Sequence, residues 1–262
     1  MKICKYIEIA KISLSNSLVY RANIISRFCF YTIFIFVFMN LWKAIYNEGG
    51  VNGYSYVQVL WYLILTEYIS FTCTSNIYNT MNDEVKTGAI AYQISRPMHY
   101  VLFQFAISLG QLLVNAFFFG ILAIALGFVF AGPLTGFCWI GIPVMVLSII
   151  LSIILNYYFM MLIGLSAFIV EENFAMFLIY QKLGFMLGMF LPVEFLPAWL
   201  QPIAKSLPFS YIYWAPAKLF VDFSYEIAFD LILRQVIWVG LVIFLVMLFY
   251  RRCERRLQVN GG

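Results

Sequence analysis

Charged residues are scarce in this chain of 262 residues, and their scarcity excludes an ordinary soluble domain. Only 11% of the residues are charged and 64% are hydrophobic, and the mean hydropathy is +0.91. Soluble proteins carry about one quarter charged residues because a chain of this size must hydrate a large surface. From Pro97 to Val170, 74 consecutive residues contain no Asp, Glu, Lys or Arg. We therefore expect an integral membrane protein in contact with the lipid bilayer.

The residues that enzymes commonly use for catalysis or metal binding are also few. The chain has one histidine, His99, and its five cysteines form no C-x-x-C pair, so neither a metal site nor a disulfide framework is expected. It contains no G-x-x-x-x-G-K-[ST] phosphate loop, no H-E-x-x-H, no G-x-S-x-G and no G-x-G-x-x-G ahead of a helix. We predict no catalytic residue and no cofactor on this chain, so energy for any work must come from a gradient or a partner subunit.

Apolar segments long enough to cross a membrane recur along the chain. A helix rising 1.5 Å per residue needs about 20 residues to cross a bilayer core of about 30 Å. Turn-rich sequence at 47–53 and 131–136 separates neighbouring segments. The sequence predicts one all-α membrane domain over residues 1–262, with spans at 28–46, 56–79, 100–130, 137–170, 174–191 and 231–250.

Three segments outside these spans have a character of their own. Residues 1–23 alternate an apolar stripe with lysines, which predicts an amphipathic helix lying in the membrane interface rather than a solvated one. Residues 82–97 predict a short surface helix closed by Arg96-Pro97, suited to docking a soluble partner, with a plain connector as the alternative. Five of the eight prolines fall within 192–218, which predicts short re-entrant or interfacial helices on the outer side.

The positive charges indicate the orientation of the chain. One side of the six predicted spans holds twelve basic residues, Lys2, Lys5, Lys11, Arg21, Arg27, Lys86, Arg96, Lys182, Arg251, Arg252, Arg255 and Arg256. The other side holds four, Lys43, Lys205, Lys218 and Arg234. Because cytoplasmic loops are enriched in Lys and Arg, we expect both termini in the cytoplasm. The same clustering beside apolar spans favours a topology signal over nucleic-acid binding.

Polar residues recur at helical spacing inside three predicted spans. Glu67 is the only carboxylate deep in a span, where a charge costs several kcal/mol unless it is paired, protonated or wetted. The three stripes are Glu67, Ser70, Thr74 and Tyr78; Gln104, Ser108, Gln111 and Asn115; and Ser148, Ser152 and Asn156. Such stripes line a translocation path or a subunit interface, or they only hold the bundle together through interhelical hydrogen bonds. The sequence leaves both readings open.

The loop "EVKTGAIAYQISRPMHY" resembles the stretch I-x-x-G-x-[LI]-[AS]-x-x-[LI]-x-[RK]-P that follows the second span in permeases of type 2 ATP-binding-cassette (ABC) exporters. The branch in question has six spans and an ATPase on a separate chain. The basic tail "RRCERRLQVNGG" and the segment "LPVEFLPAWLQPIAKSLPF" are similar to the C-terminus and the outer segment of that branch. With the N-terminal helix, the resemblance covers nearly the whole chain.

The resemblance implies a permease subunit in a bacterial plasma membrane, paired with an identical or related second permease chain and with ATPase subunits that hold ATP and Mg. Its cargo would be an amphipathic or hydrophobic drug, peptide or lipid. The implied ATPase-coupling residues are Glu84, Lys86, Gly88, Arg96 and Pro97, and the implied outer gate contains Pro192, Glu194, Pro197 and Trp199.

A proton-coupled secondary transporter using Glu67 is the alternative. Against it stand the absence of a second buried carboxylate or basic partner in the spans and of recognisable inverted repeats in the sequence.

Overall fold

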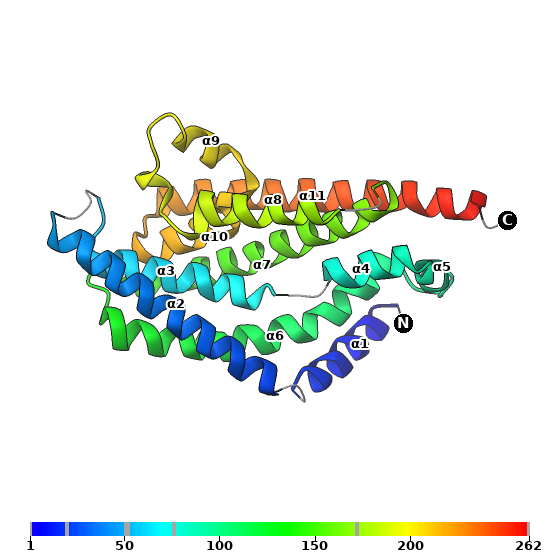
Figure 1. The fold of residues 1–262 in the computed structure, drawn as a ribbon, viewed down its shortest axis with the longest axis horizontal. Helices are drawn as coiled ribbons and strands as arrows, with labels where there is room; N and C mark the ends of the chain where they lie inside the picture. The colour runs from blue at the N-terminus through cyan, green and yellow to red at the C-terminus, as the bar shows by residue number, and fades with distance from the viewer. Residues whose placement is uncertain (1, 19–20, 50–52, 75–76, 171–172, 261–262) are drawn as a thin grey trace.

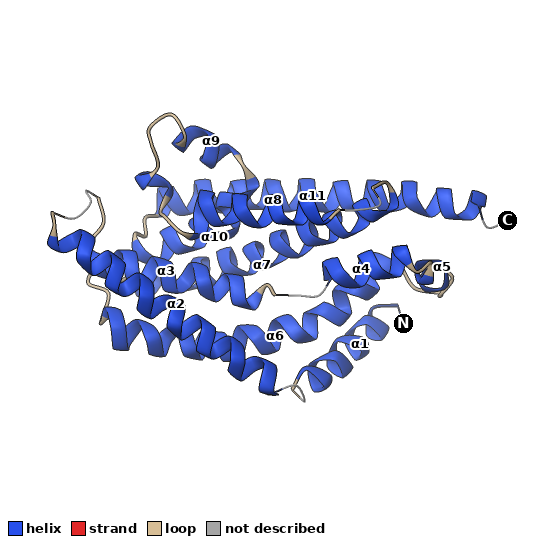
Figure 2. Cartoon of the chain, in the orientation of Figure 1, coloured by secondary structure: helices blue, strands red, loops and turns tan. Residues whose placement is uncertain are grey.

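The chain folds into a bundle of helices. The computed structural model describes residues 2–18, 21–49, 53–74, 77–170 and 173–260, and over these ranges it contains helices and loops but no strand (Figure 2). The all-α integral membrane class expected from composition is confirmed.

Within the described ranges, four helices are long and apolar enough to cross a membrane. They are α2 (Arg21–Asn47), α6 (Tyr100–Leu126, continued by a π-helical turn at Gly127–Ala131), α7 (Ile142–Leu165) and α11 (Tyr225–Asn260). They coincide with the predicted spans 28–46, 100–130, 137–170 and 231–250. Two helices extend clearly beyond the predicted bounds: α2 begins seven residues earlier, at Arg21, and α11 begins at Tyr225 and continues through the basic tail.

The other two predicted spans are less regular. Within 56–79, α3 (Tyr56–Thr72) ends with Cys73 as its C-cap, and the next helix, α4 (Ile77–Lys86), is separate from it. Within 174–191, α8 (Phe174–Gly184) continues as a π-helical turn at Phe185–Met189. Neither α3, with 17 residues, nor the apolar stretch Phe174–Met189 is long enough by itself to count as a full crossing. Six spans therefore remain a prediction.

The N-terminal helix α1 (Lys2–Ser17) lies directly on α6. At the crossing, a Cβ on Gly110 would be only 2.4 Å from the backbone nitrogen of Leu14. The Ser13 hydroxyl donates to the Ile107 carbonyl, and the His99 backbone N–H donates to the Tyr6 hydroxyl at 3.1 Å. The predicted amphipathic helix exists, and one side of it is packed against protein.

The proline-rich segment forms short helices, as predicted. A 3₁₀ turn at Val193–Phe195 is followed by α9 (Gln201–Ser206) and α10 (Pro208–Val221). Most residues of α10 are buried, and this helix packs on α3 and α7. The segment is therefore partly inserted into the bundle.

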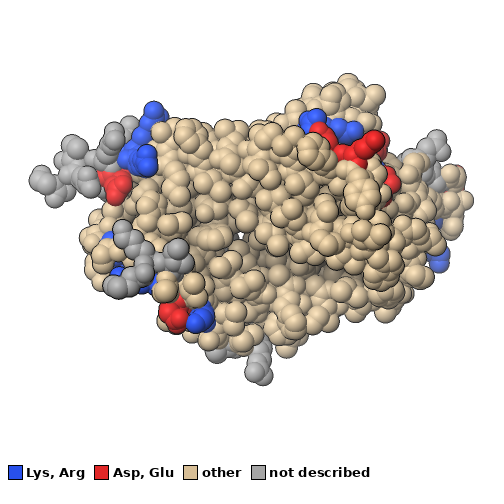
Figure 3. Space-filling model, turned by 180° about the vertical axis from the view of Figure 1, so that it is seen from behind, with Lys and Arg blue, Asp and Glu red and all other residues tan. Residues whose placement is uncertain are grey.

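The two ends of the bundle differ in what they carry. The N-terminus, the C-terminus and α5 (Ala89–Ile94) lie at one end, whereas α9 and the loop between α2 and α3 lie toward the other (Figure 1). On the face in Figure 3, charged side chains gather toward the two ends and the surface between them is almost free of charge. This distribution is the one expected of a bundle whose middle lies in lipid.

Candidate translocation pocket and coupling end

The break after α3 is held by side chains from other helices. The Arg27 guanidinium on α2 donates to the Phe71 carbonyl. The Asn115 amide on α6 donates to the Thr72 carbonyl at 3.3 Å, and the Thr74 hydroxyl donates to the carbonyl four residues before it at 3.2 Å. A helix end in a membrane must satisfy its last carbonyls locally, because lipid offers no donors. The end of α3 is thus held in place by α2 and α6.

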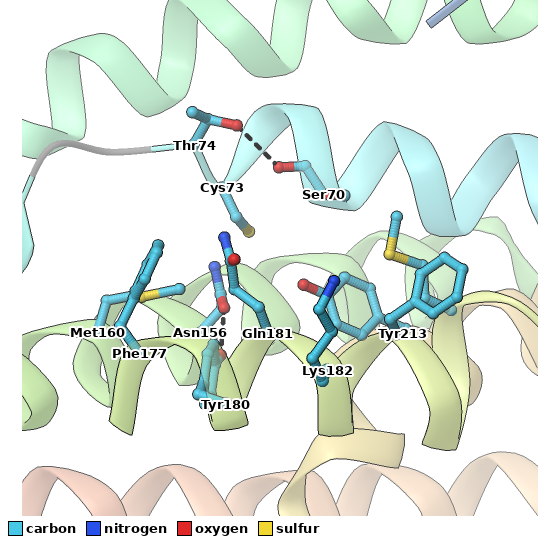
Figure 4. A pocket seen from close by; sticks show the side chains of 12 residues that line it. Ser70, Cys73, Thr74, Asn156, Met160, Phe177, Tyr180, Gln181, Lys182 and Tyr213 are labelled. Atoms are coloured by element: carbon cyan, nitrogen blue, oxygen red, sulfur yellow. Dashed lines mark hydrogen bonds between the residues drawn. The ribbon is translucent and has the colours of Figure 1, made fainter. Parts of the chain in front are cut away.

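A cavity of about 310 Å³ lies beside this end of α3, between α3, α7, α8 and α10 (Figure 4). Its lining mixes hydroxyl, thiol, amide and ammonium groups with thioethers and aromatic rings. The lining residues are Ser70, Cys73, Thr74, Asn156, Met160, Phe177, Tyr180, Gln181, Lys182, Phe185, Met189 and Tyr213. A concave site with apolar walls and a few polar groups is the usual form of a small-molecule site.

Three of the predicted path residues meet in this cavity. Ser70 and Thr74 come from the end of α3, and Asn156 comes from α7. Asn156 is 2% exposed, and its side-chain oxygen accepts a hydrogen bond from the Tyr180 hydroxyl of α8. Polar residues of α3 and α7 therefore converge on one cavity, and their role in a translocation path stays a prediction.

Glu67 does not line the cavity. Its side chain is 3% exposed, and within the described part of the chain its Oε1 atom has no hydrogen-bond partner. Tyr31 and Tyr213 are near enough to interact with it electrostatically. Tyr78, the last member of the same stripe, lies beyond the break on α4 and donates to Asn173 at 3.0 Å. The break divides this stripe into separate environments.

The stripe on α6 is used for internal contacts. Gln104 and Tyr100 donate to the Glu84 carboxylate at 3.3 and 2.5 Å, and Gln93 of α5 donates to it at 3.3 Å. Asn115 caps α3, Ser108 is buried and Gln111 is half-buried. None of the four stripe residues lines the cavity. For this stripe the contacts agree with the interpretation that its residues hold the bundle together through interhelical hydrogen bonds.

Two polar residues of α7 are also internal. The Ser148 hydroxyl donates to the Gln235 side chain of α11 at 2.8 Å. The Gln235 amide donates to the Ser152 hydroxyl at 3.0 Å and to the Tyr211 carbonyl of α10 at 2.9 Å. This closed seam ties α7, α10 and α11 together.

The predicted coupling residues surround α5 at the end that carries both termini. Gly88, which precedes α5, has a left-handed backbone with φ of +73°, a conformation that glycine adopts without steric cost. The Arg96 guanidinium lies 5.0 Å from the ring centroid of Tyr92 and 5.5 Å from that of Phe103. Glu84 faces inward and ties α4, α5 and α6 together through the hydrogen bonds described above. It therefore positions α5.

Other side chains form the solvent-exposed surface of the end that carries α5. Lys86 and Pro97 are exposed, and Tyr92 is 68% exposed. These side chains, with the ends of α1 and α11, are the ones that a soluble partner would meet.

A family model described as ABC-2 family transporter protein matches residues 19–261. The chain belongs to this family. It is a multi-pass membrane component of an ABC transporter, a permease subunit, and the family's membrane component is not itself catalytic. No curated protein and no solved structure matches the chain.

In this ABC-2 permease a hydrogen bond and an ion pair hold the predicted outer-gate segment against α10. The Glu194 carboxylate accepts from the Trp214 indole N–H at 3.0 Å and lies 3.7 Å from the Lys218 ammonium. Burial, together with the Glu194 and Asp222 carboxylates, raises the pKa of Tyr54. Pro192 is buried, whereas Pro197 is exposed and Trp199 is 69% exposed. Opening of a gate here would have to separate Glu194 from Trp214.

The sequence does not predict several of the residues that cap α3 or line the cavity of the ABC-2 permease. Arg27 and Lys182 were counted as cytoplasmic loop charges, but Arg27 caps α3 and Lys182 lines the cavity. Tyr180, Gln181 and Tyr213 were not singled out. For Lys182 a signal was present, because it falls inside the predicted span 174–191, where a lysine calls for an explanation.

Proposed function

We propose that this chain is the permease subunit of an ABC exporter that moves an amphipathic or hydrophobic substrate, such as a drug, peptide or lipid, out of the cytoplasm. The family match over residues 19–261 is the observation that carries the proposal. The sequence contains no phosphate-binding loop, so ATP and Mg would be held by a separate ATPase subunit. The mixed polar and apolar lining of the cavity supports an amphipathic cargo.

The end that carries α5 supports a docking role toward the ATPase. In this proposal it faces the cytoplasm of a bacterium, so both termini are cytoplasmic and the chain lies in the inner membrane. Glu84 holds α5 against α4 and α6, so a push on α5 would be transmitted to α4 and from there to the break beside the cavity. This route gives nucleotide-driven motion a physical path to the spans.

A second permease chain, identical or related, would complete the transporter. Of the apolar spans, α2 is the least covered, with 11% of its apolar window buried against 39% for α6 and α7. Its exposed side chains include Phe30, Ile33 and Phe36. A face this apolar is suited to a second chain as well as to lipid.

The test is co-expression with an ATPase encoded by a neighbouring reading frame. We expect the two chains to co-purify and to transport cargo in proteoliposomes only with ATP. Tyr92→Asp should weaken co-purification, because it places a charge on the exposed face of α5. Tyr225→Asp is the matched control, since Tyr225 is 66% exposed and is the first residue of α11, which begins at the end of the bundle away from α5 (Figure 1); it should leave co-purification unchanged.

The alternative, a carrier driven by protons, draws on the buried Glu67 and its unpartnered Oε1. Transport by the purified chain without an ATPase, with a proton dependence that Glu67→Gln abolishes, would favour that alternative over an ABC exporter.

A further inference from the structure

Lys182 is a basic residue within an apolar helix, and its side chain lines a cavity. It lies within the apolar stretch Phe174–Met189, where a positive charge in contact with lipid would be costly. Its side chain lines the cavity beside the end of α3 (Figure 4). Among the described residues no carboxylate lines this cavity, and Lys182 forms no ion pair within that part of the chain. The described lining of the cavity therefore carries one charge, the Lys182 ammonium.

Hydrogen-bond donors accompany this charge. The Gln181 amide and the Tyr213 hydroxyl line the same cavity, and neither makes a hydrogen bond to the described residues of the chain. Their neighbours Thr74 and Tyr180 already donate within the fold, to the Ser70 carbonyl and the Asn156 side chain. Donors without acceptors beside an ammonium form a site that matches a negatively charged, acceptor-rich group.

The volume of the cavity and its apolar walls indicate the size and the chemistry of the rest of the ligand. A volume of about 310 Å³ corresponds to about ten water molecules at their share of liquid volume, which suits a headgroup. Met160, Phe177, Phe185 and Met189 supply the apolar part of the lining. A free inorganic ion would leave these side chains without a partner, whereas the first carbons of an acyl or alkyl chain would cover them.

We propose that the cavity beside the broken end of α3 binds the anionic headgroup of an amphipathic molecule, with Lys182 as its counter-charge and Gln181 and Tyr213 as hydrogen-bond donors. Arg27 and Asn115 hold the α3 carbonyls on the side of α2 and α6, so the donors of α8 and α10 stay available. The inference extends the proposed function by naming a class of cargo, and binding can be measured without transport.

The experiment moves a thiol into the cavity mouth of the full-length chain. In the double variant Cys73→Ser/Thr74→Cys the thiol passes from a buried to an exposed lining position, and Lys182, Gln181 and Tyr213 are unchanged. The chain is placed in nanodiscs of phosphatidylcholine alone or of phosphatidylcholine with phosphatidylglycerol. Modification by neutral N-ethylmaleimide is followed by peptide mass spectrometry, with the exposed Cys29 of α2 as the internal reference.

We expect phosphatidylglycerol to slow modification at position 74 severalfold relative to Cys29. Lys182→Gln should abolish this protection and Lys182→Arg should retain it, while the exposed Lys43→Gln should have no effect. Equal rates in the two lipids, or protection that survives Lys182→Gln, would overturn the proposal. Protection by inorganic phosphate in phosphatidylcholine nanodiscs, as strong as that by phosphatidylglycerol, would assign the site to a free anion and also overturn it. None of these outcomes depends on co-purification with an ATPase.

Discussion

Two polar patches on α7 lie one helical turn apart and behave in opposite ways. Ser148 and Ser152 form a closed network with Gln235 and the Tyr211 carbonyl, and all four residues belong to the interior of the bundle. Asn156 opens toward a cavity that also contains the unpaired donors of Gln181, Lys182 and Tyr213. A closed network stabilises helix packing, whereas an open one leaves hydrogen-bonding capacity for a ligand. Polar residues of one helix thus stabilise packing in one place and, in our proposal, contribute to ligand binding in the other.

Among the described glycines, Gly110 makes the closest approach to the backbone of another helix, at the crossing of α1 and α6, and breaking this contact should have the largest effect. Gly110→Ala would place a Cβ 2.4 Å from the Leu14 backbone nitrogen, so α1 must move away. We expect a loss of about 3 kcal/mol, at the upper end for overpacking, seen as a lower Tm and faster proteolysis of α1. Gly120→Ala on the same helix is the control, because its Cβ would lie 3.6 Å from Tyr68; equal losses for both would refute the close crossing.

Opening the closed seam should have the next largest effect. Gln235→Leu removes the amide that joins α7, α10 and α11, leaves the Ser148 hydroxyl without its acceptor and takes one donor from the Ser152 hydroxyl. We expect the free energy of unfolding to fall by about 2 kcal/mol, measured by denaturation in mixed micelles. Gln111→Leu, at a half-buried position of α6, should cost clearly less.

A smaller effect is expected at the coupling end. Glu84→Gln keeps the size of the side chain but replaces charge-assisted hydrogen bonds from Tyr100, Gln93 and Gln104 with neutral ones. We expect a loss of about 1 kcal/mol in thermal stability and weaker coupling of ATP hydrolysis to transport. Asp83→Asn, at an exposed neighbouring position, is the control. A variant with normal stability and lost coupling would point to direct contact of Glu84 with the ATPase.

The smallest effect on stability is expected in the open patch. Gln181→Ala removes an exposed side chain that makes no hydrogen bond to the described part of the chain, so thermal stability should change by less than about 0.5 kcal/mol. A loss as large as that of Gln235→Leu would show that the cavity is a second closed network, and the contrast along α7 would disappear.

Most of the fold could be predicted from the sequence because hydrophobic length and charge distribution are local properties. The uncharged run, its interruption at 131–136 and the proline-rich segment led to α6, α7 and the short helices before α11. The break after Thr72 could not be found this way. No proline or glycine marks it, and its carbonyls are satisfied by Arg27 and Asn115 from other helices, contacts that exist only after folding.

The candidate site was predicted in part for the same reason. Helical spacing identified Ser70, Thr74 and Asn156, which do line the cavity, but spacing alone did not separate them from Ser148 and Ser152. That distinction depends on what faces each residue. Gln235 completes the seam from α11, far along the chain, and Lys182 reaches the cavity from α8. The spacing of polar residues along one helix predicts neither the Ser148–Gln235 hydrogen bond nor the position of Lys182 at the cavity.

The packing of α1 on α6 has a consequence for the order in which the helices assemble during synthesis. Because α1 precedes α6 in the chain, it leaves the ribosome before the surface around Gly110 on which it packs, and α2, α3, α4 and α5 are synthesised in between. Until then α1 has no protein surface to dock on. Its alternating lysines and apolar residues would hold it on the membrane surface during synthesis, so α1 would dock only after α6 has been inserted.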